Sequence, residues 1–206
     1  MRVTPSNSSD RDSRRALRAE LRSRRRNLAP LYRARAARLV AHHFDQAFHL
    51  RPGLRIAAYA SMREELDTAP LIELAHRRGC RIFLPRINRR TGRIRFVESL
   101  AGGRERRNHL GILEPHGTTH ASTRWLDLVI APLVGFDARG MRLGMGGGYY
   151  DRTFAFRNIH TSWRRPRLIG VAYALQQLQS IAAAAHDVRL DAVVTERGVV
   201  RCRSGS

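Results

Sequence analysis

An apolar segment, a helical segment and a second apolar segment follow one another in the first half of the chain. Residues 54–60 read Leu-Arg-Ile-Ala-Ala-Tyr-Ala, a short and largely apolar run that is typical of a buried strand. Residues 69–78 follow candidate capping residues and favour a helix, which Gly79 can end, and 80–85 form a second strand. A strand, a helix and a strand in this order are typical of a parallel sheet with a right-handed crossover. The unit therefore predicts an α/β fold.

The rest of the chain continues this alternation on both sides of the unit. Leucines at helical spacing predict an amphipathic helix over 14–27, and Pro30 can open a second helix. Further elements are predicted as strands at 93–98, 126–133 and 168–173, a helix over about 147–156, and a final hairpin at 190–195 and 199–201. The expected connections are irregular chain over 100–123, a loop over 134–141 and partly helical chain over 175–185.

These elements fit one domain of ordinary size, because the chain has 206 residues and a hydrophobic content of 43%. We expect residues 1–13 to be a disordered basic tail and residues 14–206 to be a single domain. The expected fold is a mostly parallel Rossmann-like sheet flanked by helices, with two amino-terminal helices. Ligands of such open sheets sit at the carboxyl ends of strands. Three segments fall there and are expected to converge on one cleft: 61–67, 135–150 and the residues after Tyr173.

One of these segments contains a glycine run. Residues 142–152 read Arg-Leu-Gly-Met-Gly-Gly-Gly-Tyr-Tyr-Asp-Arg, with four glycines in five consecutive positions. Glycine allows φ > 0 and a close backbone approach to a ligand, and consecutive N–H groups in such a turn can bind an anion. A helix that begins near Gly147 would add unpaired N–H donors. The run matches neither the dinucleotide pattern nor the P-loop, so a simple tight turn is the alternative interpretation.

Charged residues beside the glycine run favour the anion-binding interpretation. Arg142 and Arg152 bracket the run with guanidinium groups that suit phosphate or carboxylate. Asp151 adds a hard oxygen ligand, which suits the Mg²⁺ that accompanies a phosphate. We interpret the run as a phosphate cradle with a metal-binding carboxylate at its edge.

The charge balance raises a second hypothesis. The formal net charge is +21, from 38 basic and 17 acidic residues, and every basic residue is arginine. Because the sequence contains no lysine, a Schiff base or a lysine phosphate clamp within the chain is excluded. A basic surface on all sides supports non-specific binding of polyanions but specifies no target. We therefore expect no specific nucleic acid as a partner.

The cysteines and the apolar runs indicate the cellular compartment in which the protein is expected. Cys80 and Cys202 are far apart, which is typical of a reduced cytosolic protein, and Cys80 is expected in the core. Residues 1–13 lack the apolar segment of a secretory signal, and no apolar run approaches membrane-spanning length. We expect a cytoplasmic protein that does not interact with a membrane.

The glycine run resembles the signature of a known enzyme family when it is taken together with the residues before it, Arg139-Gly140-x-Arg142-Leu143-Gly144. This family is the 5-formyltetrahydrofolate cyclo-ligases, also called 5,10-methenyltetrahydrofolate synthetases. Further matches follow in the family's order and extend from about Arg14 to Val199. These matching segments are 14–18, 61–68, 83–86, 133–137, 186–188 and 191–195.

The resemblance implies an ATP- and Mg²⁺-dependent enzyme that converts 5-formyltetrahydrofolate to 5,10-methenyltetrahydrofolate. In the family mechanism, the N5-formyl oxygen attacks the γ-phosphate of ATP and ADP leaves. N10 then attacks the phosphorylated imidate, and phosphate is released. Such a reaction needs chiefly positioning and charge neutralisation, which a phosphate cradle, a metal and arginines can supply. We expect the protein to be a monomer.

The resemblance also implies a set of site residues at matched positions. Catalytic roles are implied for Arg142, Tyr150 and Asp151, and magnesium ligation for Asp151 and Asp187. Folate contacts are implied for Ala60, Met62, Glu65, Gly147 and Tyr149, of which Glu65 can accept hydrogen bonds from the pterin. ATP contacts are implied for Arg14, Arg18, Arg142, Leu143, Gly144, Met145, Gly146, Gly147, Gly148, Tyr149 and Tyr150.

Several positions depart from the family pattern or allow another interpretation. Some relatives carry basic residues where this chain has Met145 and Gly147, so the positive charge there must come from arginines or backbone N–H groups. Ala185 and Arg189 replace two prolines of the carboxyl-terminal block. Single site residues also allow a purely structural interpretation. Arg14 and Arg18 could be solvated helix arginines, and Glu65 could be a surface carboxylate. Tyr149 or Tyr150 could pack in the core, and Asp187 could form an Asx turn. For the whole chain the alternative is a non-catalytic polyanion or nucleic-acid-binding protein on the same fold.

Overall fold

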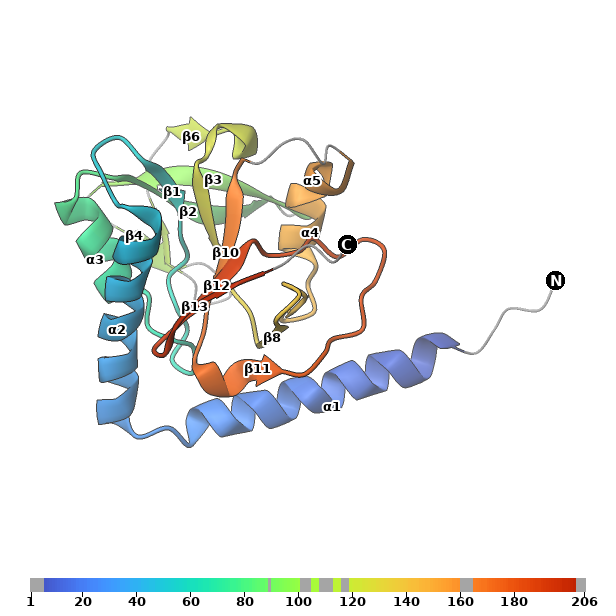
Figure 1. Ribbon diagram of the computed structural model, residues 1–206. Coiled ribbons are helices and arrows are strands. Elements are labelled where there is room, and N and C mark those ends of the chain that lie inside the picture. Colours follow the sequence, from blue (N-terminus) through green and yellow to red (C-terminus); the bar gives the residue numbers. More distant parts are fainter. Residues whose placement is uncertain are drawn as a thin grey trace.

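A sheet of eight strands forms the centre of the computed structural model, which describes residues 6–88, 90–100, 105–107, 113–115, 119–159 and 165–202 (Figure 1). The strand order is β13-β12-β10-β7-β1-β2-β3-β6. Five neighbouring strands are parallel: β12 (Ala192–Thr195), β10 (Arg167–Val171), β7 (Leu128–Ala131), β1 (Arg55–Ala57) and β2 (Arg81–Asn88). The outer strands pair antiparallel: β13 (Gly198–Arg201), β3 (Arg93–Ser99) and β6 (His120–Ala121). The prediction of a mostly parallel α/β sheet is confirmed.

Helices cover both faces of this sheet (Figure 1). On one face lie α2 (Pro30–Phe48) and α3 (Ala69–Arg77), and on the other lie α4 (Tyr149–Phe154) and α5 (Phe156–Ile159). Strand β7 shows why both faces need a cover: Leu128 and Ile130 pack into the core with α2 and α3, whereas Val129 and Ala131 pack into the core with α4. A strand that is apolar at every position is typical of a sheet buried on both sides.

Helix α1 (Ser6–Arg26) runs across one end of the molecule and packs on a second, smaller sheet (Figure 1). This sheet has the order β11-β8-β9, from β8 (Gly135–Asp137), β9 (Arg142–Leu143) and β11 (Gln177–Leu178). Leu21 of α1 is fully buried between these elements, which stabilises the docked helix by about 2 kcal/mol. The helix approaches closely because Gly135 has no side chain: a Cβ there would lie 2.7 Å from Cδ1 of Leu21. Strand β9, which α1 covers, leads directly into the glycine run.

Four connections differ from the prediction. The expected loop over 134–141 contains β8, and the expected irregular stretch over 100–123 contains a hairpin of β4 (Glu105–Arg107) and β5 (Leu113–Pro115) as well as β6. The segment 175–185, which was expected to be partly helical, is helical only in the 3-10 turn Ala174–Gln176, and it continues through β11 (Gln177–Leu178) into irregular chain. The expected disordered tail falls partly on residues 1–5, outside the described residues, but residues 6–13 are helical. Of these elements, β6 and β8 pair with strands that are distant in the sequence, β3 and β11, which local patterns do not reveal.

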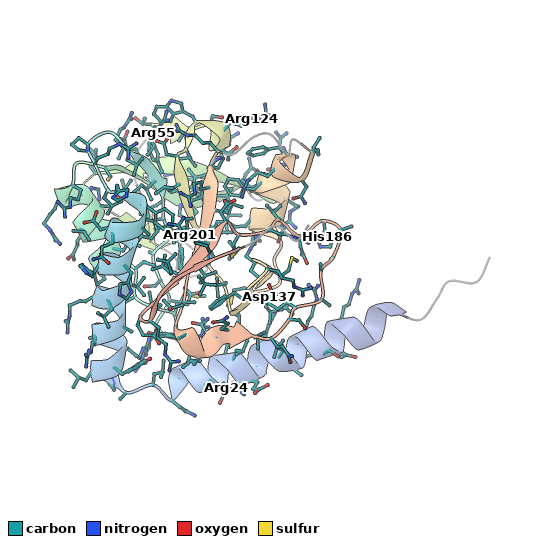
Figure 2. All side chains as sticks on the ribbon, in the orientation of Figure 1. Arg24, Arg55, Arg124, Asp137, His186 and Arg201 are labelled. Carbon is teal, nitrogen blue, oxygen red and sulfur yellow. The ribbon has the colours of Figure 1, made fainter. Side chains whose placement is uncertain are left out.

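Arginines occur in many elements of the structure. Figure 2 labels Arg55 and Arg124 at one end of the molecule, Arg24 at the other end on α1, and Arg201 between them. Others are engaged in ion pairs, such as Arg55 with Asp127 at 2.8 Å and Arg81 with Glu98 at 2.7 Å. Ion pairs therefore neutralise part of the basic charge, while eight of the 21 residues of α1 are arginine. Within the described ranges, no helix is both long enough and apolar enough to cross a membrane.

Candidate active site

A cavity of about 420 Å³ opens at the carboxyl ends of the central strands. Its wall includes Ala60 after β1, Pro132 after β7, and the glycine run after β9. His186 and Asp187 approach from the segment after β11. The three segments that were expected to converge therefore do meet at one cavity.

Nearly all the expected site residues line this cavity. Leu143 does not: it is buried in the small core beneath α1, and this correction removes it from the expected ATP contacts. The cavity wall also contains residues that the sequence did not single out, chiefly an apolar side formed by Tyr59, Pro85, Ile87, Ile94 and Pro132. The expected residues that line the wall are Arg14, Arg18, Ala60, Met62, Glu65, Arg142, Gly144, Met145, Gly146, Gly147, Gly148, Tyr149, Tyr150, Asp151 and Asp187.

The glycine turn presents its backbone to the cavity. Gly146 and Gly148 have φ values of +101° and +61°, in the left-handed region that favours glycine. Helix α4 begins at Tyr149, after the run, and has only six residues, so the turn itself must supply the anion-binding groups. None of the N–H groups from Gly144 to Gly148 donates to another residue within the described part of the chain. A row of free N–H donors at a cavity wall can bind an anion.

A substitution at Gly147 tests whether the glycine turn binds the anion. A Cβ at Gly147 would lie 2.6 Å from Cε2 of Tyr149, whereas a Cβ at Gly144 would meet nothing within 4 Å. We expect Gly147→Ala to displace Tyr149 and to weaken ATP binding about tenfold, roughly the loss of one charge-assisted hydrogen bond. The matched control Gly144→Ala should bind ATP nearly as the wild type does. Calorimetric titration with ATP measures both, and equal affinities in the two variants would contradict this role of Gly147.

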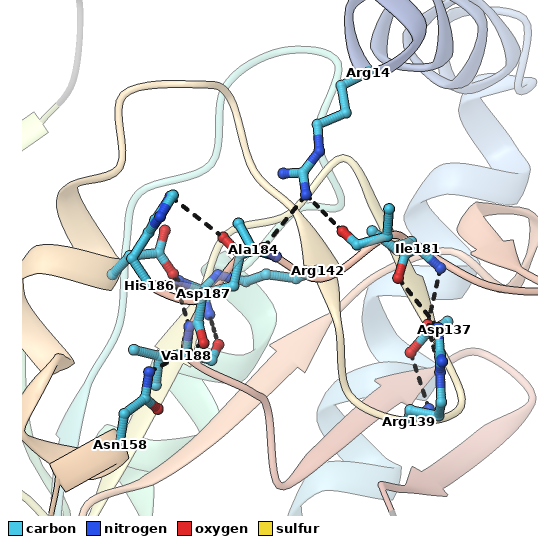
Figure 3. Close-up of polar contacts among 12 residues, drawn as sticks. Arg14, Asp137, Arg139, Arg142, Asn158, Ile181, Ala184, His186, Asp187 and Val188 are labelled. Atoms are coloured by element: carbon cyan, nitrogen blue, oxygen red, sulfur yellow. Dashed lines mark hydrogen bonds and ion pairs between the residues drawn. The ribbon is translucent and has the colours of Figure 1, made fainter. Parts of the chain in front are cut away.

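Two arginines of α1 reach the cavity. Nε of Arg18 donates to the carbonyl of Gly144 at 2.8 Å, so this helix touches the glycine turn directly. Nη2 of Arg14 donates to the carbonyl of Ala182 at 2.5 Å and lies 3.5 Å from Oδ2 of Asp187 (Figure 3). Burial, and then the nearby charge of Arg14, lower the pKa of Arg18. Two like charges held together in this way favour a polyanionic ligand between them.

Asp151 is oriented by Arg142 (Figure 3 shows the Arg142 side chain). Nη2 of Arg142 donates to Oδ1 of Asp151 at 2.7 Å, and the N–H of Val188 donates to the same oxygen at 3.1 Å. Nη1 of Arg142 also donates to the carbonyl of Val188. Oδ2 of Asp151 accepts no hydrogen bond from any described residue. The carboxylate is therefore fixed through one oxygen and can offer the other to a cation.

Asp187 lies on a loop that polar contacts hold in place (Figure 3). Its Oδ2 accepts from the N–H of Ala184 at 2.9 Å, and Nδ2 of Asn158 donates to its backbone carbonyl at 3.2 Å. Among the described residues, no group of three or more His, Cys, Asp and Glu side chains is arranged to hold a metal. Mg²⁺, however, commonly takes one or two carboxylates and completes its shell with phosphates and water.

Glu65 is a buried carboxylate in the wall of the cavity. Its surface is 4% exposed, and its Oε2 accepts from the N–H of Met62 at 2.9 Å. Burial raises the pKa of Glu65, and the N–H of Met62 opposes this effect. The hydroxyl of Tyr150 is buried without a partner among the described residues, and burial raises its pKa. Tyr150 therefore stays protonated and can donate a hydrogen bond.

Arg152 does not have the expected role. Its Nη2 donates to the carbonyl of Gly147 at 2.7 Å, and its Nε donates to the carbonyl of Gly92 at 3.0 Å. The guanidinium also lies 5.1 Å from the ring centre of Tyr149. Arg152 is absent from the described wall of the cavity. The prediction that it faces an anion is wrong, because its donors hold the glycine turn from outside.

Comparisons with known proteins agree on one family. Residues 10–196 match the model of the 5-formyltetrahydrofolate cyclo-ligase family. The 5-formyltetrahydrofolate cyclo-ligase of Haemophilus influenzae is 32% identical over 182 residues, covering 86% of this chain and 94% of that protein. Its counterpart in Escherichia coli K12 is 33% identical over 180 residues, covering 85% of this chain and 96% of that protein. The NMR structure of Aquifex aeolicus 5,10-methenyltetrahydrofolate synthetase superposes with a TM-score of 0.78 at 26% identity and covers 94% of each chain.

Proposed function

Because the chain belongs to the 5-formyltetrahydrofolate cyclo-ligase family of ligases, we propose that it converts 5-formyltetrahydrofolate to 5,10-methenyltetrahydrofolate at the expense of ATP. One observation carries the proposal: a single cavity brings together the glycine turn, the buried carboxylate of Glu65 and the fixed carboxylate of Asp151. These groups suit a polyphosphate, a ring with N–H donors and a cation, respectively.

The two substrates occupy different walls of the cavity in this proposal. ATP places its phosphates on the N–H groups of the glycine turn, between Arg14 and Arg18. The folate places its pterin against the apolar side and donates N–H groups to Glu65. Ala60, Met62 and Tyr149 complete the folate side, and Gly147 lies where the two substrates meet. The γ-phosphate then faces the formyl oxygen.

The reaction proceeds in two steps. The N5-formyl oxygen forms a bond to the γ-phosphorus, the bond from that phosphorus to the bridging oxygen breaks, and ADP leaves. N10 then bonds to the formyl carbon, the carbon–oxygen bond breaks, and phosphate leaves with the former formyl oxygen while N10 loses its proton. Arg142 holds Asp151 in place, and the hydroxyl of Tyr150 can donate a hydrogen bond to a developing negative charge. The arginines of α1 neutralise the charge of the phosphates.

The carboxylates fit a magnesium ion bound together with ATP. Oδ2 of Asp151 accepts no hydrogen bond from a described residue, and Asp187 lines the same cavity. Mg²⁺ bound there would offset the negative charge of the β- and γ-phosphates.

An isotope experiment tests the proposed chemistry. Substrate labelled with ¹⁸O in the formyl group should give one labelled oxygen in each phosphate released, because the formyl oxygen leaves on phosphorus. ADP and the methenyl product should form in equal amounts. Unlabelled phosphate alongside the methenyl product would exclude the imidate route, and ATP hydrolysis without any methenyl product would exclude the function itself.

A further inference from the structure

Arg33, near the start of α2, reaches away from its own helix to the segment that carries Glu65. Its Nη2 donates to the backbone carbonyl of Arg63 and, at 3.3 Å, to the backbone carbonyl of Glu65. Its Nε donates a long hydrogen bond of 3.4 Å to the hydroxyl of Tyr173. Tyr173 is fully buried and follows β10. The guanidinium therefore connects the core of the protein to the backbone around Glu65.

The residues around Glu65 form a turn that holds itself together. The N–H of Glu65 donates to the carbonyl of Met62 at 2.9 Å, and the N–H of Met62 donates to Oε2 of Glu65 at 2.9 Å. These two bonds close residues 62–65 into one unit, in which the carboxylate and the backbone move together. Leu66, which is buried in the core, fixes only the end of this unit. The position of the Glu65 carboxylate therefore depends on what else holds the turn.

Arginines of two helices contact this turn, and they differ in what they hold. Arg22 and Arg26 of α1 pair with the side chain of Glu64 at 2.5 and 3.4 Å, but 39% and 58% of these arginine side chains are exposed. Ion pairs between exposed side chains contribute little. Arg33 instead binds two backbone carbonyls of the turn with one planar guanidinium, and a charged donor makes the stronger kind of hydrogen bond. Arg33 is therefore the contact that sets where the backbone of the turn lies.

We propose that Arg33 is a positioning residue of the folate site: by binding the carbonyls of residues 63 and 65, it places the Glu65 carboxylate where that group meets the N–H donors of the ligand. Arg33 does not line the described cavity, so it acts from behind the turn and not by contact with the ligand. A misplacement of about 1 Å in a binding group can cost up to about a hundredfold in rate. The inference rests on the proposed function, in which that ligand is the pterin.

A double-mutant cycle that combines Arg33→Met with Glu65→Gln tests whether Arg33 acts through Glu65. Methionine removes the charge and the donors at similar length. We expect Arg33→Met alone to raise the KM for 5-formyltetrahydrofolate about tenfold and to leave the KM for ATP within about twofold. In the Glu65→Gln background the same substitution should raise the folate KM by less than about twofold, because residues that act as a unit are not additive. Arg33→Lys, which keeps a charged donor, should restore part of the loss.

The matched control is Arg35→Met, which neutralises an exposed arginine on the same helix that does not line the described cavity. It should leave both KM values near those of the wild type. Amide hydrogen exchange, followed by mass spectrometry, gives a second measurement that needs no turnover. Arg33→Met should speed exchange in the peptide that contains residues 61–67 by about fivefold or more, since local opening becomes easier when a hydrogen bond to the turn is lost. Arg35→Met should not change this exchange.

The outcomes separate this inference from the proposed function. Unchanged exchange at residues 61–67 in Arg33→Met overturns the positioning of the turn, and Arg33→Gln serves as a second neutral variant if the first does not fold. The same increase of the folate KM in the wild-type and Glu65→Gln backgrounds overturns the action through Glu65. A wild-type protein that does not form the methenyl product would refute the function, while faster exchange confined to residues 61–67 would still support the action of Arg33 on the turn.

Discussion

Replacing Asp151 by asparagine is expected to lower kcat/KM about a thousandfold while leaving the fold intact. The amide oxygen of asparagine can still accept from Arg142 and Val188, so the local hydrogen bonds have a substitute. In the proposed mechanism, the substitution removes the negative charge that would hold a cation beside the phosphates of ATP. A loss of about 4 kcal/mol in the transition state is typical when charge stabilisation by a metal is removed, and it corresponds to about a thousandfold in rate. Steady-state kinetics over a range of Mg²⁺ concentrations measures the effect.

The control for this variant is Glu73→Gln, which neutralises an exposed carboxylate on α3 that does not line the cavity. It should retain wild-type kinetics. If Asp151→Asn showed the same dependence on Mg²⁺ as the wild type, the metal role of Asp151 would be refuted. Circular dichroism of both variants confirms that the comparison concerns folded protein.

Replacing Glu65 by glutamine is expected to raise the KM for 5-formyltetrahydrofolate about thirtyfold to a hundredfold. Glutamine has almost the same shape but exchanges one acceptor oxygen for an N–H₂ donor. That donor would face the N–H groups of the pterin, and a hydrogen bond to a charged group is worth about 2–3 kcal/mol. The KM for ATP should stay within about twofold, because in the proposed arrangement the phosphates bind to the glycine turn and to Arg14 and Arg18, and not to Glu65. Initial rates at varied folate and varied ATP separate the two effects.

Glu64 supplies the matched control, since it is the neighbouring carboxylate and pairs with Arg22 and Arg26 outside the described cavity wall. Glu64→Gln should leave the KM for folate near the wild-type value. Equal effects of the two substitutions on this KM would mean that the carboxylate of Glu65 does not receive the pterin.

The central architecture could be predicted from the sequence because apolar runs mark its strands and a clear helix separates β1 from β2. β1, α3 and β2 lie within the segments expected for them or extend just beyond, and so does the final hairpin of β12 and β13. β8 and β9 could not be predicted, because no apolar run marks them and their pairing is confined to the small sheet, where β9 pairs with β8 and β8 pairs with β11. These strands nevertheless shape the site, because α1 packs on their sheet and its Arg18 contacts the glycine turn.

The candidate site was predictable in its residue types but not in the direction of its side chains. Arg142 and Arg152 bracket the glycine run symmetrically in the sequence, but one orients Asp151 and the other binds the carbonyl of Gly92, 60 residues away. Arg33 was hidden among the arginines of α2. A usable signal existed, because Arg33 lies three residues before Ala36 and seven before Val40, on the apolar face of the helix.

The most direct test of the account is the absorbance of the product. Purified wild-type protein is mixed with 5-formyltetrahydrofolate and Mg²⁺, and the long-wavelength band of 5,10-methenyltetrahydrofolate is followed before and after ATP is added. We expect the band to appear only after ATP addition and to reach an amount equal to the limiting substrate. No band in the presence of ATP, from protein whose circular dichroism shows it to be folded, would contradict the account.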